Sequence, residues 1–344
     1  MTEPLAAAAF ANVRSILSLA IEHAPDRRAL LLFDRASPLA ALLADAYRDA
    51  LPGATAVDAS ASPGGANAAI DRLAAGDLVV LVESVRFFPE EHRFRVRLFD
   101  RGLKVVEHPH LARTLPGEEA TYVDALAYDP AYYRPLGAAL KRRLDRAAGA
   151  RVSGAGATLE YRGGFEEARL NVGDYGGQRN VGGQFPIGEV FTEPRDLSAV
   201  DGEVVLFAFG DAEFGVTAPE RPFPVRIERG LVTGAPGAPP AFAAILDAIR
   251  AGEEVVRVRE LGLGLNRALT RERRVSDVGS YERMNGVHLS LGSKHAIFAK
   301  PGIAKRRAKF HVDVFAAVER VEIDGVNVYA EGFFEPAGPA SSPA

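Results

Sequence analysis

Five residues in the second half of this 344-residue chain are of types that bind metal ions in proteins: Glu189, Glu260, His288, His311 and Asp313. Each lies in an apolar or glycine-marked segment. A buried charge without a partner is costly, so a carboxylate or imidazole in such a segment must be ion-paired, hydrogen-bonded or bound to a cation. The residue types therefore predict a buried metal site.

The strand period of two indicates where the Glu260 side chain points. In the segment 255–260, Glu260 is in phase with Val256 and Val258, so its carboxylate should share their buried face. The same period predicts that Arg257 and Arg259 point outward. An ion pair with one of these arginines is the alternative role for Glu260.

Two further strand patterns carry the other ligand-type residues. In the segment 309–314, the period of two places His311 and Asp313 on one face, within reach of a single cation. In the segment 287–292, His288 and Ser290 alternate with apolar residues, which predicts a strand with one apolar and one polar face. Glu189 follows a turn with proline and glycine, at the start of a short apolar run. A turn or helix-capping role is the alternative for Glu189, and a structural core histidine the alternative for His288.

Four segments of this half, GGQFPIGEVFTEP, ELGLGLN, GVHLSLG and KFHVDV, occur in this order and are followed by VEIDG. They resemble the metallopeptidases of the aminopeptidase T and aminopeptidase S type, a thermophilic-type leucyl aminopeptidase family. The resemblance covers residues 177–332. It implies that the five residues named above bind two divalent metal ions (Zn, Co, Mn or Mg), and that Glu282 is the catalytic carboxylate.

This chain departs from the family pattern at two positions. The spacing from Glu282 to His288 is one residue longer than in close members, and His295 stands where they usually have a tyrosine. The alternative to a catalytic role for Glu282 is a residue of a solvated polar loop. His295 is either a loop residue or a donor that binds substrate.

The resemblance implies a metallo-aminopeptidase, a hydrolase that releases N-terminal residues from short peptides and forms a homodimer. Glu189 or Asp313 would bridge the two ions, and Glu282 would act as general base and then general acid. One alternative is an iron-dependent ring-cleaving dioxygenase of the 2,5-dihydroxypyridine dioxygenase type, which uses two histidines and one carboxylate; there we expect a histidine in place of Glu260. A non-catalytic metal-binding relative is the other alternative.

Composition limits the classes of partner and the cellular compartment that we expect for this protein. The net charge is −4 with a pI near 6.0, which gives no general attraction to nucleic acid. Cysteine is absent, so disulfides and thiolate ligands are excluded and the metal ligands must be histidines and carboxylates. Residues 3–24 read as an amphipathic helix and not as a signal peptide, and no apolar run is long enough to span a membrane. We therefore expect a cytoplasmic protein with no nucleic-acid or membrane partner.

The sequence predicts an α/β N-terminal region with a small parallel sheet, followed by a β-rich α+β metal-binding domain. Alternating helix and strand patterns predict strands at 29–33, 54–58, 78–82 and 104–106, and helices at 5–24, 38–51, 66–75, 119–127 and 131–148. Short strands, glycine turns and one clear helix at 240–250 follow. We expect domains at 1–150 and 151–334 and a disordered tail at 335–344. Four histidines of the first half (His23, His92, His108, His110) are interpreted as surface residues.

Overall fold

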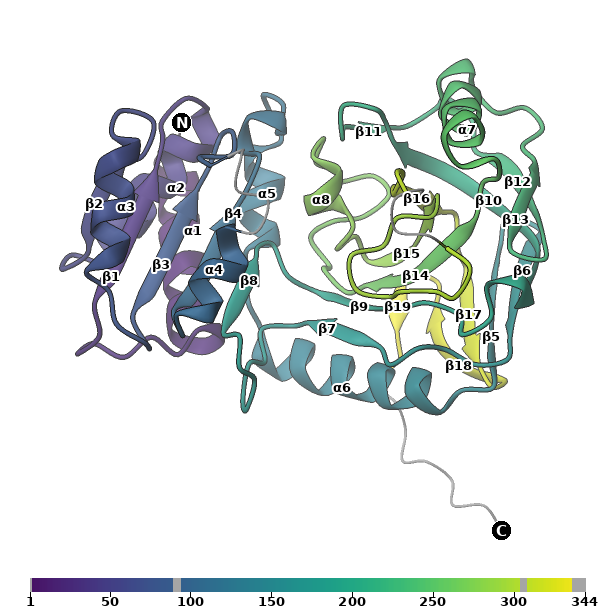
Figure 1. Cartoon of the computed structure of the whole chain (residues 1–344), viewed down its shortest axis with the longest axis horizontal. Helices are drawn as coiled ribbons and strands as arrows, with labels where there is room; N and C mark the ends of the chain where they lie inside the picture. Colours follow the sequence, from purple (N-terminus) through teal and green to yellow (C-terminus); the bar gives the residue numbers. More distant parts are fainter. Residues whose placement is uncertain (1, 89–93, 304–307, 336–344) are drawn as a thin grey trace, which may run out of the picture. The chain divides into compact units, whose positions relative to one another are not determined.

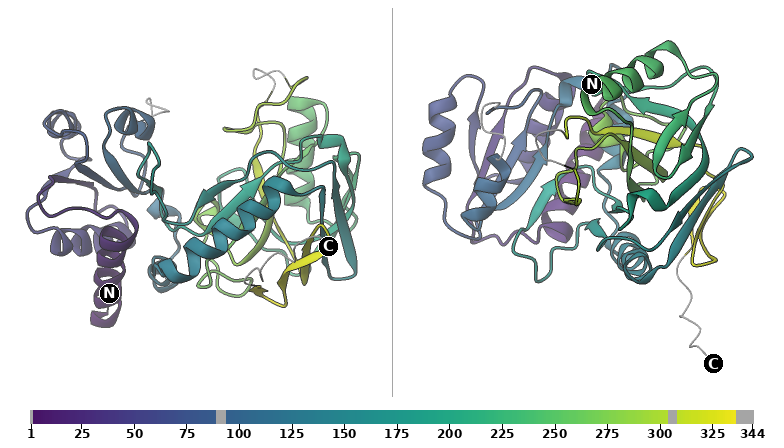
Figure 2. Two further views of the ribbon diagram at one scale, coloured as in Figure 1. Left: turned by 90° about the horizontal axis from the view of Figure 1, so that it is seen from below. Right: turned by 45° about the vertical axis from the view of Figure 1, so that its right-hand side comes forward.

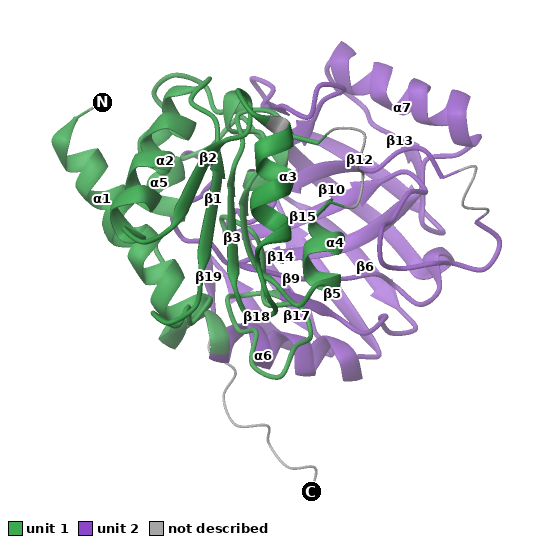
Figure 3. Cartoon of the chain, turned by 60° about the vertical axis from the view of Figure 1, so that its left-hand side comes forward, with its two compact units in different colours: residues 1–134, 171–187, 273–280 green, residues 135–170, 188–272, 281–344 purple. Residues whose placement is uncertain are grey.

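The structure is a computed structural model that describes residues 2–88, 94–303 and 308–335. By spatial contact the chain forms two compact units, shown in Figure 3. Unit 1 contains residues 1–134, 171–187 and 273–280; unit 2 contains residues 135–170, 188–272 and 281–344. Residue 150 lies in the first strand of the large sheet of unit 2, and the division into domains near that residue stays a prediction.

Unit 1 contains a five-stranded sheet of parallel strands in the order β2-β1-β3-β4-β8. The sequences ALLLF in β1 and LVVLV in β3 are buried at every residue, as expected for parallel strands covered on both faces. Apolar residues of α3 and α4 pack on one face, in front of the sheet in Figure 3. The elements are α1 (Glu3–Ser15), η1 (Ile16–Ala20), β1 (Ala29–Phe33), α2 (Pro38–Ala50), β2 (Thr55–Asp58), α3 (Pro63–Asp71), β3 (Leu78–Val82), α4 (Phe94–Asp100), β4 (Lys104–His108), η2 (Leu111–Arg113), α5 (Glu119–Ala125) and β8 (Gly182–Gln184).

Most predicted elements of unit 1 are confirmed, with differences at their ends. The strands at 29–33 and 78–82 have the predicted bounds. The helix predicted at 66–75 begins earlier, at Pro63, because proline is favoured in the first turn of a helix. The interpretation of His108 as a surface residue is wrong: its side chain is buried and its ring nitrogens lie 2.7 Å from the hydroxyl of Tyr47 and 3.1 Å from that of Tyr122. His92 lies outside the described residues.

Unit 2 is built on a large sheet of fourteen described strands (Figures 1 and 2). Eleven of them follow the path β19-β18-β17-β5-β6-β10-β16-β15-β14-β9-β7; β11 and β12 also pair with β10, and β13 pairs with β12. Its strands pair antiparallel, which confirms the predicted β-rich second region. The elements are β5 (Gly149–Gly154), β6 (Ala157–Arg162), β9 (Glu189–Thr192), η3 (Leu197–Ala199), β10 (Val200–Gly210), β11 (Val216–Thr217), β12 (Phe223–Glu228), β13 (Leu231–Gly234), α7 (Pro240–Glu253), β14 (Val258–Gly264), β15 (Gly286–Leu291), β16 (Val312–Ala316), β17 (Arg320–Ile323), β18 (Val326–Ala330) and β19 (Phe333–Phe334). The chain passes between the units five times: within α6 (Pro130–Arg146), β7 (Arg169–Asn171) and α8 (Val278–Tyr281), and at residues 187–188 and 272–273.

Four neighbouring strands of this sheet, β16, β15, β14 and β9, come from separate parts of the chain. Their registers place Glu189 opposite Gly264, Gly262 opposite His288, and Ser290 opposite Asp313. These pairings gather the ligand-type residues into one region of the sheet. Most of the tail predicted to be disordered, residues 336–344, lies outside the described part of the chain.

Candidate metal centre

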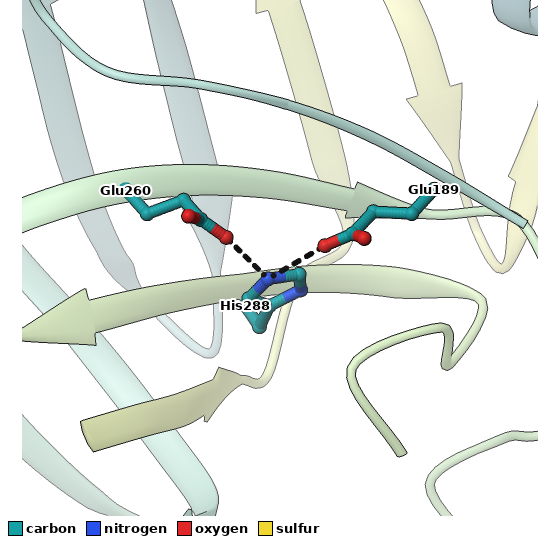
Figure 4. A group of neighbouring side chains, drawn as sticks. All are labelled: Glu189, Glu260 and His288. Atoms are coloured by element: carbon teal, nitrogen blue, oxygen red, sulfur yellow. Dashed lines mark hydrogen bonds and ion pairs between the residues drawn. The ribbon is translucent and has the colours of Figure 1, made fainter. Parts of the chain in front are cut away.

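Glu189, Glu260 and His288 come from three adjacent strands and their side chains converge on one point (Figure 4). His288 Nε2 lies 3.3 Å from Glu189 Oε1 and 3.1 Å from Glu260 Oε1. One ligating atom from each residue lies within 4.8 Å of the others. All three residues are buried, with 5% exposure or less. Two carboxylates and one imidazole at this separation fit a divalent cation such as zinc.

A glycine makes room for the imidazole of this group. Gly262 lies opposite His288 in the pairing of β14 with β15. A methyl group at Gly262 would lie 2.6 Å from His288 Nδ1 and closer still to Cε1 and Nε2. The His288 ring therefore lies against the bare backbone of the neighbouring strand.

His311 and Asp313 form a separate pair at the start of β16. His311 Nε2 lies 3.1 Å from Asp313 Oδ1, and His311 Nδ1 lies 3.1 Å from the carbonyl oxygen of Lys294. Both side chains are thus on one face, as the strand period predicted. The pair is outside the group of three, but the rings of His311 and His295 are 5.6 Å apart and His295 contacts Glu260. Two of the five predicted ligands therefore lie beside the group.

Arg283 is a member of this site that the sequence reasoning missed. Its buried guanidinium lies 3.1 Å from Glu189 Oε2 and forms an ion pair with Glu282. Burial opposes a charged guanidinium, but the charges of Glu189 and Glu282 outweigh it and raise the pKa of Arg283. The sequence carried a weak signal, because Arg283 lies between Glu282 and the apolar Met284, close to His288.

Glu282 faces the ligand residues and is not a solvated loop residue. Its side chain is 23% exposed and ion-paired with Arg283. Burial raises the pKa of its carboxyl group to about 8; the charge of Arg283 opposes this shift, and the charges of Asp313 and Glu189 add to it. A carboxyl group with such a pKa exchanges a proton near neutral pH.

His295 packs against Glu260. Its side chain is 3% exposed and its Nε2 lies 2.6 Å from Glu260 Oε2. Its Nδ1 accepts hydrogen bonds from the backbone N–H groups of Ile297 and Phe298, at 3.1 and 3.3 Å. The expected role of His295 in binding substrate stays a prediction, while its contact with a ligand-type carboxylate is observed.

The titrating groups of the site perturb one another. Burial raises the pKa of Glu260, but its hydrogen bonds to His288 and His295 outweigh this and lower the pKa overall. Burial opposes a charged imidazole in His288, but the hydrogen bonds and charges of Glu189 and Glu260 raise the pKa of His288 well above its usual value. The two carboxylates on either side of His288 Nε2 thus favour the protonated imidazole.

The prediction that Arg259 points outward is wrong. Arg259 is 2% exposed, and its guanidinium donates to Glu193 Oε2 at 2.6 Å and to the Phe298 carbonyl at 2.8 Å. The register of β14 against β15 shifts between Val258 and Leu261, and β14 lies between two other strands. Every residue of β14 is buried, so both of its faces are covered. Arg259 is ion-paired with Glu193, and Glu260 remains in the candidate centre.

No family model and no curated protein matches this chain. Among solved structures, the 2,5-dihydroxypyridine dioxygenase of Pseudomonas putida aligns over 96% of this chain and 97% of its own, with 16% identity and a TM-score of 0.65. Wild-type AmpT of Thermus thermophilus aligns over 95% of this chain and 99% of its own, with 15% identity and a TM-score of 0.57. No helix in the described part of the chain is long and apolar enough to cross a membrane. The chain thus has the same fold as both AmpT and a 2,5-dihydroxypyridine dioxygenase.

Proposed function

We propose that this protein is a metal-dependent aminopeptidase that releases N-terminal residues from short peptides. The observation that supports this most is the position of Glu260, a buried carboxylate whose oxygen lies 3.1 Å from His288 Nε2. The group of three therefore contains two carboxylates and one histidine, whereas an iron-dependent oxygenase typically uses two histidines and one carboxylate.

In this proposal Glu189, Glu260 and His288 hold one divalent ion, and His311 and Asp313 contribute to a second. Bound divalent ions would polarise the peptide carbonyl and lower the pKa of the attacking water. Glu189 has one oxygen toward His288 and the other 3.1 Å from Arg283. One oxygen of Asp313 is likewise ion-paired, with His311 at 3.1 Å, so Glu189 and Asp313 are both candidates for a carboxylate that two bound ions would share.

Glu282 is the residue we assign to proton transfer. It takes a proton from the attacking water and gives it to the leaving amine. Without bound metal, burial raises the pKa of this carboxyl group to about 8; bound divalent ions would favour the carboxylate form that accepts the proton. Arg283 holds Glu282 beside Glu189 through the ion pairs it makes with both carboxylates. Its fixed charge stabilises the anionic form of Glu282 while the proton is transferred.

A dioxygenase is the second candidate. The rings of His295 and His311 are 5.6 Å apart, and His311 is paired with Asp313, so two imidazoles and one carboxylate also lie together. A relative in fold with this activity has a TM-score of 0.65. In that case the iron would lie on this side of the site, and Glu260 would not be a ligand.

Metal reconstitution separates the two candidates. Metal-stripped protein is loaded with Zn, Co or ferrous iron and assayed for hydrolysis of amino-acyl anilides and for oxygen uptake with 2,5-dihydroxypyridine. We expect Zn or Co to restore hydrolysis. Restoration by ferrous iron alone, with oxygen uptake, would establish the dioxygenase.

Variants test the ligand assignment in the same assays. Glu260→Gln and His311→Ala should each lower metal content and abolish hydrolysis. Glu228→Gln, at an exposed carboxylate in β12, is the matched control and should retain both. Full metal content and hydrolysis in Glu260→Gln would contradict the proposal. The homodimer and the preference for short peptides stay predictions.

A further inference from the structure

We propose that His295 is a positioning residue: it donates a hydrogen bond from Nε2 to Glu260 and so holds that carboxylate with its other oxygen toward the metal position. The inference rests on the metal centre of the proposed function, with Glu260 as a ligand, but not on peptide hydrolysis. It differs from a role in binding substrate, because the partner of His295 is a residue of the protein.

The hydrogen bonds of the His295 ring determine which nitrogen carries the proton. Two backbone N–H groups, from Ile297 and Phe298, point at Nδ1. An N–H group can donate only to an unprotonated ring nitrogen, so Nδ1 is the acceptor and the proton of the neutral imidazole is on Nε2. That Nε2–H group faces Glu260 Oε2 at 2.6 Å. His295 therefore donates to the carboxylate.

The two oxygens of Glu260 consequently have different roles. Oε2 accepts from His295, while Oε1 lies 3.1 Å from His288 Nε2 in the group of three. The backbone N–H of Glu260 donates to Ser290 Oγ at 3.0 Å, which fixes the main chain at this point. With one oxygen held by a donor, the carboxylate cannot rotate freely and presents Oε1 alone. Such partners of metal ligands orient the ligand and strengthen metal binding.

His295 is held in place by packing and by its own segment. Its ring packs against that of Phe298, with centroids 4.8 Å apart. The carboxylate of Glu253, at the end of α7, accepts from the backbone N–H of Ser293 at 2.7 Å and from those of Lys309 and Phe310 at 2.6 and 2.8 Å. One buried carboxylate thus anchors the chain on both sides of His295, and the ring is in position without a substrate.

The same geometry disfavours His295 as a metal ligand. A neutral histidine binds a metal through an unprotonated nitrogen. In His295 that nitrogen is Nδ1, and it is already occupied by two backbone donors. The ring contributes to the centre through Glu260.

The test compares two substitutions of His295 in the full chain. His295→Phe keeps an aromatic ring against Phe298 but removes the donor. His295→Gln keeps an N–H donor at nearly the same reach. Zn and Co dissociation constants and stoichiometries are measured by competition with a chelator, and thermal unfolding of the metal-free protein is measured in parallel. His108→Phe, at a buried histidine of unit 1 hydrogen-bonded to Tyr47 and Tyr122, controls for the loss of a buried imidazole.

We expect His295→Phe to bind metal about 10- to 100-fold more weakly than wild type with unchanged stoichiometry. His295→Gln should recover most of that loss, and His108→Phe should lower thermal stability but not metal affinity. In a Glu260→Gln background, His295→Phe should have little further effect, because the carboxylate that it orients is gone.

Three results would overturn the inference. They are unchanged metal affinity in His295→Phe, equal losses in the Gln and Phe variants, and loss of a whole metal equivalent in His295→Phe, which would make His295 a ligand. Failure of the proposed function is distinguishable, because a wild-type protein that binds metal but hydrolyses no peptide leaves the positioning role intact.

Discussion

Gly262→Ala should disable the metal centre although no ligand residue is replaced. Gly262 lies opposite His288 across two paired strands, and its φ is not in the left-handed region. Alanine is therefore acceptable to the backbone, and its effect comes from the added methyl group alone.

The displacement follows from the structure. The new Cβ would lie 2.6 Å from His288 Nδ1, whereas ordinary contacts begin at 3.4 Å, so the ring must withdraw by about 0.8 Å at this atom and further at Cε1 and Nε2. Metal–ligand distances tolerate about 0.2 Å. His288 Nε2 would thus leave its place near Glu189 and Glu260, and we expect metal affinity to fall by about 100-fold or more, beyond the usual effect of losing a partner of a ligand.

The assay compares metal affinity, by chelator competition, with thermal unfolding of the metal-free protein. Crowding at a packed position should destabilise the metal-free protein by about 1–3 kcal/mol. Gly234→Ala is the matched control in unit 2, because a methyl group at Gly234 meets no atom within 4 Å and its φ is also not left-handed. It should leave affinity and stability unchanged.

A double variant separates crowding from the loss of the ligand. In a His288→Ala background the ring is absent, so Gly262→Ala should no longer destabilise the protein, and metal affinity should be no lower than in His288→Ala alone. The reasoning is refuted if Gly262→Ala binds metal as tightly as Gly234→Ala, since His288 would then not need its observed position.

Three further predictions follow from the titrating groups. Glu282→Gln should lower kcat by about 10²- to 10⁴-fold with metal content unchanged; an unaltered rate would exclude Glu282 as the base, and loss of metal would make it a ligand. Burial opposes the charged form of His311, but the charge and hydrogen bond of Asp313 outweigh this effect and raise the pKa of His311 to about 10. Metal binding at pH 7 should therefore release protons, and metal affinity should increase as pH rises. Calorimetry in buffers of different ionisation enthalpy measures the number of protons released, and a metal affinity independent of pH would contradict the prediction. Burial, with the charge of Glu107, raises the pKa of Glu83 in unit 1 to about 8, so between about pH 4.5 and pH 8 the folded protein holds a proton that the unfolded chain has released. The free energy of unfolding should therefore fall over this range by up to a few kcal/mol, and it should fall more in wild type than in Glu83→Gln. Denaturant unfolding at a series of pH values measures the difference, and parallel pH profiles for the two proteins would contradict the prediction.

Local patterns in the sequence were sufficient for much of the fold. Continuous apolar runs predicted β1 and β3 with their observed bounds, because a strand buried on both faces needs apolar residues at every position. Asp324-Gly325 is a dipeptide that favours a two-residue hairpin, and it forms the turn between β17 and β18, where Ile323 pairs with Val326. β8 was missed, because three residues with two glycines carry no strand period and pair with β4 only in the folded sheet.

The sequence by itself determined which residues can bind a metal, and the tertiary structure decided which of them meet. Residue type and strand phase pointed to Glu189, Glu260 and His288, but they lie in one group because β9, β14 and β15 are adjacent in the sheet. Arg283 and Arg259 were not assigned correctly, because each is buried against a carboxylate from a distant segment. A charged residue can be buried only beside a partner, and the periodicity of its own strand gives no information about a partner from another segment.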